Sequence, residues 1–157
     1  MTLEIRDATA ADADAAAEAM RRSITELCLA DHRNDPKVLD AWLANKKPEV
    51  FRAWLQHEDQ SYLVAVEDGR VVCVGGVTDA GHITLNYVSP DARFRGVSRA
   101  MLAALEWRAR DRGTLECTLE STATARSFYR ARGYVETGPP DRKFGTESGF
   151  PMRKMLV

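Results

Sequence analysis

Apolar and polar residues alternate in some short stretches of the chain, and apolar residues recur every three or four positions in others. Alternation is typical of strands, and the longer spacing is typical of amphipathic helices. We expect strands over residues 3–8, 61–67, 70–78, 82–89, 114–120, 134–137 and 150–156. We expect helices over residues 10–30, 97–112 and 121–132, and two short helices that begin at Pro36 and Pro48.

Glycine marks the points at which several of these elements turn or end. Asp68-Gly69 separates two strands and is typical of a tight hairpin, because glycine adopts the positive φ that such a turn needs. Gly75-Gly76 inside the next strand indicates a bulge or a close backbone approach. Gly113 is suited to end a helix, and the strands on either side of that helix then form a parallel β-α-β unit.

The order of elements predicts one α/β (α+β) domain over residues 1–157. We expect a mixed, mainly antiparallel sheet of about seven strands flanked by helices. Trp42 and Trp54 are interpreted as core residues of the two short helices. Glu106 is interpreted as an outer-face residue of its helix, paired with Arg110 one turn later. His57 is interpreted as a surface residue at a helix end.

The stretch over residues 87–113 runs from a strand through a basic loop into a helix. The first N–H groups of a helix have no partner inside it, and the helix dipole gives this end partial positive charge. A phosphate placed there accepts those hydrogen bonds. Gly96 lets the backbone approach such a ligand, and Arg93, Arg95 and Arg99 add positive charge. The stretch predicts a phosphate site, with an ordinary strand-to-helix connection as the alternative.

Composition places the chain among folded domains. Its 157 residues are 45% hydrophobic and 29% charged, which suffices for one hydrophobic core. The net charge of −1 gives no overall field that attracts nucleic acid or an anionic membrane, so neither is expected as a partner. Three scattered cysteines, Cys28, Cys73 and Cys117, suit small core residues in a reducing compartment. With an acidic, alanine-rich N-terminus unlike a signal peptide, the chain is expected to be cytoplasmic.

Several catalytic and binding signatures are absent from the sequence. It has no GxxxxGKS/T nucleotide loop, no GxGxxG after a strand, no HExxH motif and no Cys/His metal spacing. A serine-centred GxSxG elbow is also missing. We therefore expect no metal site.

Two motifs resemble signatures of one enzyme family. The first, Arg93-x-x-Gly96-x-Ser98, resembles the Q/R-x-x-G-x-G/A signature of the GNAT acyltransferases, with serine in place of the final Gly or Ala. The second, at residues 122–134, resembles N-x-x-A-x-x-F-Y-x-x-x-G-F/Y, with Thr122 in place of the frequent Asn. The two motifs occur in the family's order, separated by one helix and one strand, which is harder to obtain by chance than either motif alone.

The resemblance implies acetyl-CoA as co-substrate. In the family, the loop amides hold the pyrophosphate of coenzyme A, and the end of the fourth strand pairs with the pantetheine like an added strand. Carried onto this chain, the implied coenzyme contacts are Asn86, Tyr87, Val88, Arg93, Phe94, Arg95, Gly96, Val97, Ser98, Arg99, Thr122 and Tyr129.

Acetyl transfer to an amine needs a proton donor for the departing thiolate. The resemblance places Tyr129 near the coenzyme sulfur. A phenol stays protonated at neutral pH, so we expect Tyr129 to be the acid. A role as an aromatic core residue beside Phe128 is the alternative.

The same reaction needs a base that deprotonates the amine. His82 opens a strand at a position where some family members carry a catalytic glutamate, and an imidazole titrates near neutrality. By strict alternation its side chain shares a face with Asn86. His32 is the rival base, Glu116 and Glu120 are further candidates, and a chain of water molecules is another route.

We therefore expect an N-acetyltransferase that moves an acetyl group from acetyl-CoA to a small-molecule or peptide amine, directly in a ternary complex. Cys117 is the residue that would overturn direct transfer. A non-catalytic CoA- or acyl-CoA-binding sensor is the alternative function. Acceptor specificity is expected in the first helices and in the loop over residues 138–149, and a homodimer through the late strands is a further expectation.

Overall fold

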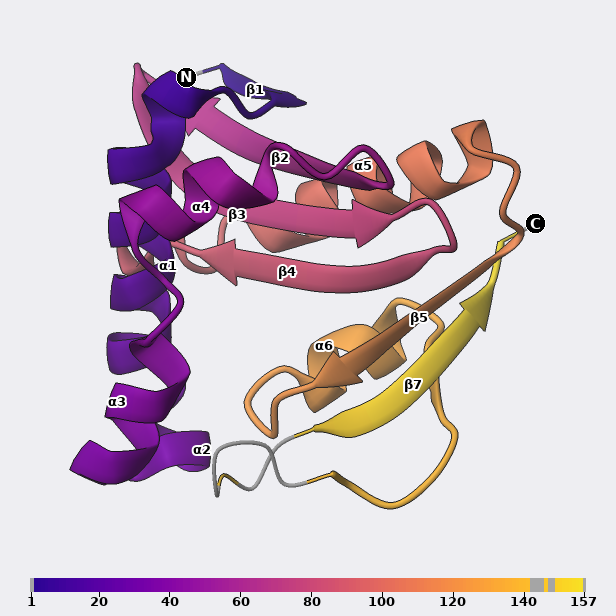
Figure 1. Ribbon diagram of the computed structural model, residues 1–157. Coiled ribbons are helices and arrows are strands. Elements are labelled where there is room, and N and C mark those ends of the chain that lie inside the picture. The colour runs from indigo at the N-terminus through magenta and orange to yellow at the C-terminus, as the bar shows by residue number, and fades with distance from the viewer. Residues whose placement is uncertain (1, 142–145, 147–148, 157) are drawn as a thin grey trace.

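The computed structural model, which describes residues 2–141, 146 and 149–156, is built on one twisted sheet (Figure 1). Its seven strands lie in the order β1-β2-β3-β4-β5-β7-β6. They are β1 (Leu3–Asp7), β2 (Gln60–Glu67), β3 (Arg70–Thr78), β4 (His82–Val88), β5 (Glu116–Ser121), β6 (Val135–Glu136) and β7 (Phe150–Met155). Within the described residues only β4 and β5 pair in parallel, so the predicted mixed, mainly antiparallel sheet is confirmed.

Helices cover both faces of this sheet. They are α1 (Ala13–Leu27), α2 (Leu29–His32), α3 (Pro36–Leu43), α4 (Pro48–Trp54), α5 (Val97–Asp111) and α6 (Arg126–Ala131), with single 3-10 turns η1 (Ala10–Asp12) and η2 (Pro90–Ala92). In Figure 1, α5 and α6 lie behind the sheet. Among the helices of the described residues, none is long and apolar enough to cross a membrane.

Alternate residues of the central strands fill two cores, as their period of two predicts. Leu63 joins Met101 of α5 in one core, whereas Tyr62 and Val74 join α1 and α4 in the other. Gly75 lies directly under α5, because a Cβ at this position would be 2.5 Å from the sulfur of Met101. The glycine therefore lets α5 approach the sheet closely.

The first helix is shorter than predicted. It stops at Cys28, whose backbone leaves helical geometry, and the short α2 follows and ends at Arg33 in the left-handed region. The helix after β5 is also shorter, because the chain makes a turn before α6 begins at Arg126. The two segments contact each other, because Asp31 of α2 accepts hydrogen bonds from Ala123 and Thr124 in the turn before α6.

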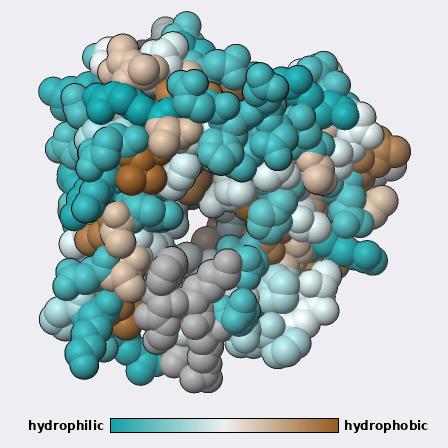
Figure 2. All heavy atoms as spheres, viewed as in Figure 1, coloured by the Kyte–Doolittle hydropathy of each residue, from teal (hydrophilic) through white to brown (hydrophobic). Residues whose placement is uncertain are grey.

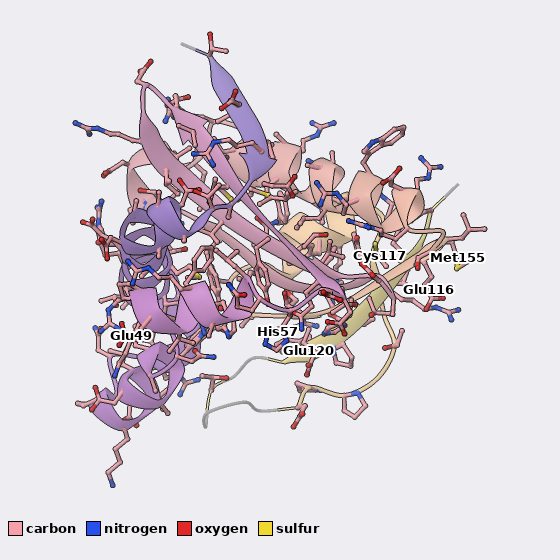
Figure 3. All side chains as sticks on the ribbon, turned by 45° about the horizontal axis from the view of Figure 1, so that its top comes forward. Glu49, His57, Glu116, Cys117, Glu120 and Met155 are labelled. Atoms are coloured by element: carbon pink, nitrogen blue, oxygen red, sulfur yellow. The ribbon has the colours of Figure 1, made fainter. Side chains whose placement is uncertain are left out.

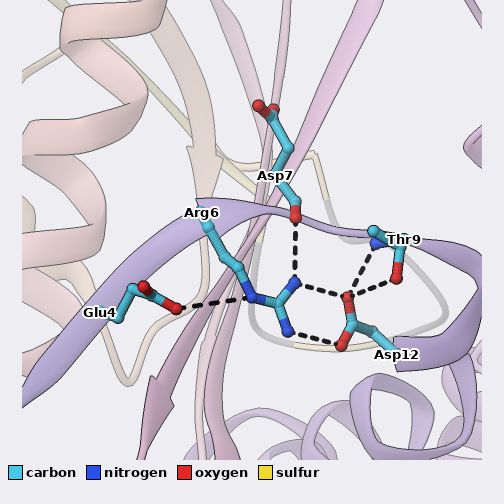
Figure 4. A network of polar contacts seen from close by, with 5 residues as sticks. All are labelled: Glu4, Arg6, Asp7, Thr9 and Asp12. Atoms are coloured by element: carbon cyan, nitrogen blue, oxygen red, sulfur yellow. Dashed lines mark hydrogen bonds and ion pairs between the residues drawn. The ribbon is translucent and has the colours of Figure 1, made fainter.

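A polar network fixes the passage from β1 into η1 (Figure 4). The Arg6 guanidinium donates to both carboxylate oxygens of Asp12, at 2.8 and 2.9 Å, and the Thr9 backbone N–H donates to the same carboxylate at 2.7 Å. Arg6 also donates to the Asp7 carbonyl and lies 3.7 Å from Glu4. Chiefly because of the hydrogen bond from Arg6, the pKa of Asp12 falls to about 2.

Strand β4 contains one residue more than the part of β3 opposite it. Gly76 pairs with Leu85, whereas Val77 pairs with Ile83, so Thr84 is the extra residue of a β-bulge. A Cβ on Gly76 would lie 2.6 Å from Oγ1 of Thr84, so glycine leaves room for this side chain. The irregularity that the paired glycines predict is confirmed, with its extra residue in β4.

The bulge changes which side chains share a face of β4. Ile83 joins the core beside α5, and Leu85, two residues later, joins the core beside α1. Strict alternation would place both on one face. The expectation that His82 and Asn86 share a face is wrong for the same reason, and the two side chains line different cavities.

The prediction for the outer face of α5 is wrong at Glu106. Its carboxylate accepts hydrogen bonds from the Tyr134 hydroxyl at 2.7 Å and from Lys154 at 3.2 Å, and its side chain is only 15% exposed. The neighbouring Trp107 is instead 69% exposed. Spacing along α5 could not reveal that the segment leading into β6, and β7 itself, pack beside Glu106.

Candidate active site

The parallel strands β4 and β5 separate after a very short contact. They pair only at His82 with Thr118 and at Ile83 with Leu119. Beyond this point the strands diverge (Figure 1), so the edge of β4 that faces β5 has no strand beside it within the described residues. Such an edge leaves backbone N–H and C=O groups available to a ligand.

Two cavities meet at this split. We name them the α5 cavity, of 560 Å³, and the α3 cavity, of 430 Å³, after the helices beside them. The residues that line both are Ile83, Thr84, Leu85, Tyr87, Glu120 and Thr122. A space-filling view shows the hollowed face over the sheet (Figure 2). Because the cavities share a wall, molecules bound in each can touch at the split.

The start of α5, at residues 94–99, has the geometry that the predicted anion cradle requires. The backbone N–H groups of residues 94–99 donate no hydrogen bond within the described part of the chain, and Ala100 donates the first one, to Gly96. Gly96 has φ +78°. This left-handed conformation is costly for residues with a Cβ, so glycine is required for conformation as well as for access.

Side chains of the basic loop fall into two groups. Arg93, Phe94 and Arg99 line the α5 cavity, and the Arg93 guanidinium lies 4.3 Å from the centre of the Phe94 ring, which is 88% exposed. Arg95 does not line the cavity and pairs with Glu67 at 2.6 Å. The expectation that the side chain of Arg95 supplies charge to the cradle is therefore wrong, although its backbone belongs to the loop.

The remaining expected coenzyme contacts lie around the same cavity. The side chains involved are Asn86, Tyr87, Val88, Val97, Ser98, Thr122 and Tyr129, and Gly96 lines it as well. The Asn86 amide donates to the Ser98 carbonyl at 3.4 Å and so joins β4 to the first turn of α5. Tyr129 is buried, and burial raises the pKa of its hydroxyl, an effect that the Asn86 side chain partly offsets.

Asp31 of α2 holds the turn that precedes α6. Its buried carboxylate accepts hydrogen bonds from the Ala123 N–H at 2.6 Å and from the Thr124 hydroxyl at 2.6 Å. The Thr122 hydroxyl accepts a hydrogen bond from the Ala125 N–H at 3.1 Å within the same turn. Asp31 is the neighbour of a candidate base in the sequence, but the sequence did not indicate this contact. Ala123 and Thr124 follow Asp31 by 92 and 93 positions.

His32 lies where a catalytic base would have no access to an acceptor. The ring is 1% exposed and lines neither cavity. Its Nδ1 accepts a hydrogen bond from the Asn34 N–H at 3.0 Å, so its Nε2 is the protonated nitrogen and donates to the Ile24 carbonyl at 2.9 Å. Nε2 holds α2 against α1 and Nδ1 is used in the turn after α2, so we do not retain His32 as a candidate base.

His82 lies at the mouth of the split and lines the α3 cavity. Its Nδ1 is 2.9 Å from the hydroxyl oxygen of Thr118, its partner on β5. If Nδ1 donates to this hydroxyl, Nε2 carries the lone pair that a base needs. Glu120 lies two residues further along β5 at the junction of the cavities, and Figure 3 shows it near His57. Glu116 lines neither cavity.

Much of the wall of the α3 cavity comes from residues to which the sequence gave no catalytic or binding role. Trp42 and Trp54 pack as predicted, Trp42 beside Tyr87 and Trp54 stacked on Tyr62, yet all four line the cavity. His57, expected on the surface, is exposed and lines it too. Lys46, which follows α3, is buried and lines the cavity, and the sequence gave no signal for this role. Of the loop over residues 138–149, residues 142–145 and 147–148 lie outside the described part.

The cysteines do not form an evident nucleophile. Cys117 is buried, lines neither cavity, and lies near Glu116 and Met155, away from Glu120 (Figure 3). Cys28 lines the α5 cavity, and burial raises its pKa to about 12. Among the described residues, no cluster of His, Cys, Asp and Glu is arranged to hold a metal ion.

Known structures share this architecture over nearly the whole chain. A GCN5-related N-acetyltransferase from Rhodopseudomonas palustris is 28% identical, with a TM-score of 0.86 over 99% of this chain and 97% of the other. The PaiA N-acetyltransferase from Thermoplasma acidophilum, solved in complex with coenzyme A, is 20% identical, with a TM-score of 0.84 over 99% and 100% of the two chains. The ribosomal-protein-S18-alanine N-acetyltransferase from Escherichia coli is 21% identical, with a TM-score of 0.71 over 99% and 95%.

The sequence itself matches a family model as well. A search of curated proteins gives no significant match. The model described as an acetyltransferase (GNAT) domain matches residues 11–156, which include the anion cradle, the split between β4 and β5, and both cavities. This match and the shared fold agree with the resemblance of the two sequence motifs, and the chain belongs to the GNAT acetyltransferase family.

Proposed function

We propose that this protein is an acetyl-CoA-dependent N-acetyltransferase that binds acetyl-CoA in the α5 cavity and an acceptor amine in the α3 cavity. The observation that carries this proposal is the split between β4 and β5, where the two cavities share Thr84, Glu120 and Thr122. A donor and an acceptor held on either side of the split can react directly, since proximity replaces a bimolecular encounter.

The α5 cavity fits coenzyme A in its chemistry. The unpaired N–H groups of residues 94–99 at the start of α5 suit a pyrophosphate, and Arg93 and Arg99 line the same space. The free edge of β4 at residues 86–88 suits the amide groups of pantetheine, which can pair with it as an added strand. When bound, the coenzyme supplies an acetyl thioester.

Tyr129 and His82 are proposed as the acid and the base. Burial raises the pKa of Tyr129, so its hydroxyl holds a proton at neutral pH and can give it to a departing thiolate in the α5 cavity. On the other side of the split, His82 takes a proton from the acceptor ammonium, directly or through water, while Thr118 fixes its ring. The raised pKa of Cys28 keeps it a thiol, which favours direct transfer over an acyl-cysteine.

We further propose a cytoplasmic setting and an acceptor that is a small-molecule or peptide amine. The three cysteines are unpaired and buried, which suits a reducing compartment. The α3 cavity is within the ~300–1,000 Å³ range typical of small-ligand sites.

The proposed function is tested by measuring thiol release from acetyl-CoA with a panel of amines, alongside coenzyme A binding by calorimetry. We expect binding together with amine-dependent thiol release and a product that is one acetyl group heavier than the amine. Coenzyme binding without thiol release for any amine would instead indicate the CoA-binding sensor. No coenzyme binding would contradict both functions.

A further inference from the structure

Lys46 is a buried cation in the wall of the α3 cavity. The residue is 5% exposed, although lysine is almost never buried without a partner. It lies between α3 and α4, and its ammonium donates to the Asn45 side-chain oxygen at 2.6 Å and reaches the Trp42 carbonyl at 3.5 Å. An ammonium has three N–H donors, so these two neutral acceptors leave one donor over within the described residues.

The backbone of Lys46 is held in place by Arg21. Arg21 of α1 donates to the carbonyl of Leu43 at 3.1 Å and to the carbonyl of Lys46 at 3.4 Å. The segment between α3 and α4 is thereby held against α1, on the side of the sheet where the α3 cavity opens. The Lys46 side chain is therefore presented to the cavity by an anchored backbone.

Within the described part of the chain, no neighbouring carboxylate balances the charge of Lys46. No Asp or Glu among the described residues lies within ion-pair distance of its Nζ. Burial lowers its pKa to about 8, and no acidic group of the described residues opposes this fall. An anion in the cavity would supply both the missing charge and the missing acceptor.

The α3 cavity is polarised along its length. Glu120 lies at the junction with the α5 cavity, whereas Lys46 lines the α3 cavity alone. An acceptor ammonium is favoured near Glu120 and an anionic group near Lys46, with Trp42 and Trp54 available to the apolar body between them. Among the described residues, the other titratable groups that line this cavity are His57, His82, Tyr62 and Tyr87, and burial raises the pKa of both tyrosines.

We propose that the acceptor is an amine that also carries an anionic group, a carboxylate or a phosphate, and that Lys46 binds this group in the α3 cavity. The inference rests on the proposed N-acetyltransferase function and narrows its acceptor class. It excludes simple polyamines as preferred acceptors, because a second ammonium would lie against Lys46 without a compensating anion.

The test compares acceptors that differ only in the anionic group. L-amino acids are assayed against the corresponding amino acid amides, and aminoalkylphosphonates against alkylamines. Both comparisons are made with wild type and with Lys46→Met, which keeps an unbranched side chain one atom shorter and removes the charge. We expect wild type to prefer the anionic acceptors. In Lys46→Met, the KM for them should rise about 10- to 100-fold, the effect of one charge-assisted hydrogen bond, while the KM for neutral acceptors changes less than about twofold.

A second measurement does not depend on turnover. Calorimetry of the protein saturated with coenzyme A follows binding of N-acetyl-L-amino acids and of their amides, with the thermal midpoint of each variant as a check on folding. Carboxylate-selective binding that disappears in Lys46→Met supports the inference even if no amine is acetylated. The absence of acetylation would contradict only the proposed function. Equal effects of the variant on neutral and anionic ligands, or a wild-type preference for neutral amines, would overturn the inference and assign Lys46 to the support of α3. The preference for L-amino acids or for aminoalkylphosphonates decides between a carboxylate and a phosphate.

Discussion

The α5 cavity and the α3 cavity lie side by side but are built in different ways. The anion cradle of the α5 cavity consists of main-chain groups from one continuous stretch, the loop between β4 and α5, although α1, β5 and α6 also contribute residues to the cavity lining. The α3 cavity depends on side chains that come from α3, α4, β2, β4 and β5, as well as from the segment that carries Lys46. The phosphate end of one cavity is thus a local backbone structure, whereas the other cavity is an assembly of distant side chains.

This difference explains why one side of the site can be common to a family while the other varies. Backbone amides bind a pyrophosphate with many different side chains around them, provided that the turn at Gly96 is kept. Side chains such as Lys46 can change without altering the fold. We expect substitutions near the α5 cavity to affect coenzyme binding or chemistry, and substitutions in the α3 cavity to affect the choice of acceptor.

The largest effect is expected for Tyr129→Phe, which tests whether chemistry belongs to the α5 side of the split. Loss of the hydroxyl should lower kcat by about 10²- to 10⁴-fold, the usual contribution of a general acid, with KM for acetyl-CoA nearly unchanged. Steady-state kinetics with both substrates measures the two parameters. Phe128→Leu is a suitable control, because Phe128 packs against Tyr129 but has no proton to donate. An unchanged kcat in Tyr129→Phe would remove this residue from the mechanism.

A smaller effect is expected for His82→Gln on the α3 side. The variant should lose about 10- to 100-fold in kcat/KM near neutral pH. Its activity should recover as pH rises, because the acceptor amine then loses its own proton without a base. Thr118→Val, which removes the hydroxyl beside Nδ1 of His82, should also lower kcat/KM, by a smaller factor. A pH–rate profile of His82→Gln that parallels that of wild type would argue against the base role.

Coenzyme A affinity is expected to fall by about tenfold in Gly96→Ala, because a Cβ strains the left-handed turn and enters the anion cradle. Gly113→Ala is a matched control. Gly113 also has a positive φ, +90°, and open space around its Cβ position, but it lies beyond the other end of α5 and lines neither cavity. Both variants should lose similar stability in a thermal melt, and only Gly96→Ala should weaken coenzyme A binding by calorimetry. Equal affinities in the two variants would contradict the cradle.

The smallest effect on activity is expected at Asp12, outside both cavities. Its pKa falls from 3.8 to about 2 on folding, so its ion pair stabilises the fold above about pH 4, and the stabilisation is lost as pH falls toward 2. Since Arg6 is 39% exposed, we discount the effect for solvent screening to about 1–2 kcal/mol. Urea unfolding of Asp12→Asn should show this deficit at pH 7 and none at the acid end, with both KM values unchanged. A deficit that does not depend on pH would contradict the assigned pKa.

Local sequence was sufficient for most of the fold. The hairpin at Asp68-Gly69, the helix starts at Pro36 and Pro48, and the β-α-β unit with its helix end at Gly113 are found as predicted. Each of these features depends on the backbone preferences of a few adjacent residues. The family resemblance came from the same kind of information, because its two motifs are contiguous.

Errors arose where a side chain met a partner far away in the chain. Glu106 was expected at the surface and is half-buried beside Tyr134, and Arg95 was expected in the cradle and pairs with Glu67. His32 was considered as a base, although both its ring nitrogens are used within the fold. No pattern within these local stretches contained those contacts.

The sequence by itself determined the order of the elements, the anion cradle and the family resemblance, because these depend on backbone conformation and short spacing. Only the tertiary structure decided the geometry of the acceptor side. The bulge at Thr84 turns His82 and Asn86 to opposite faces of β4, and the packing of α1 against the segment after α3 brings Lys46 to the α3 cavity. Both outcomes depend on contacts between residues far apart in the chain, whose energies are settled only when the whole domain has folded.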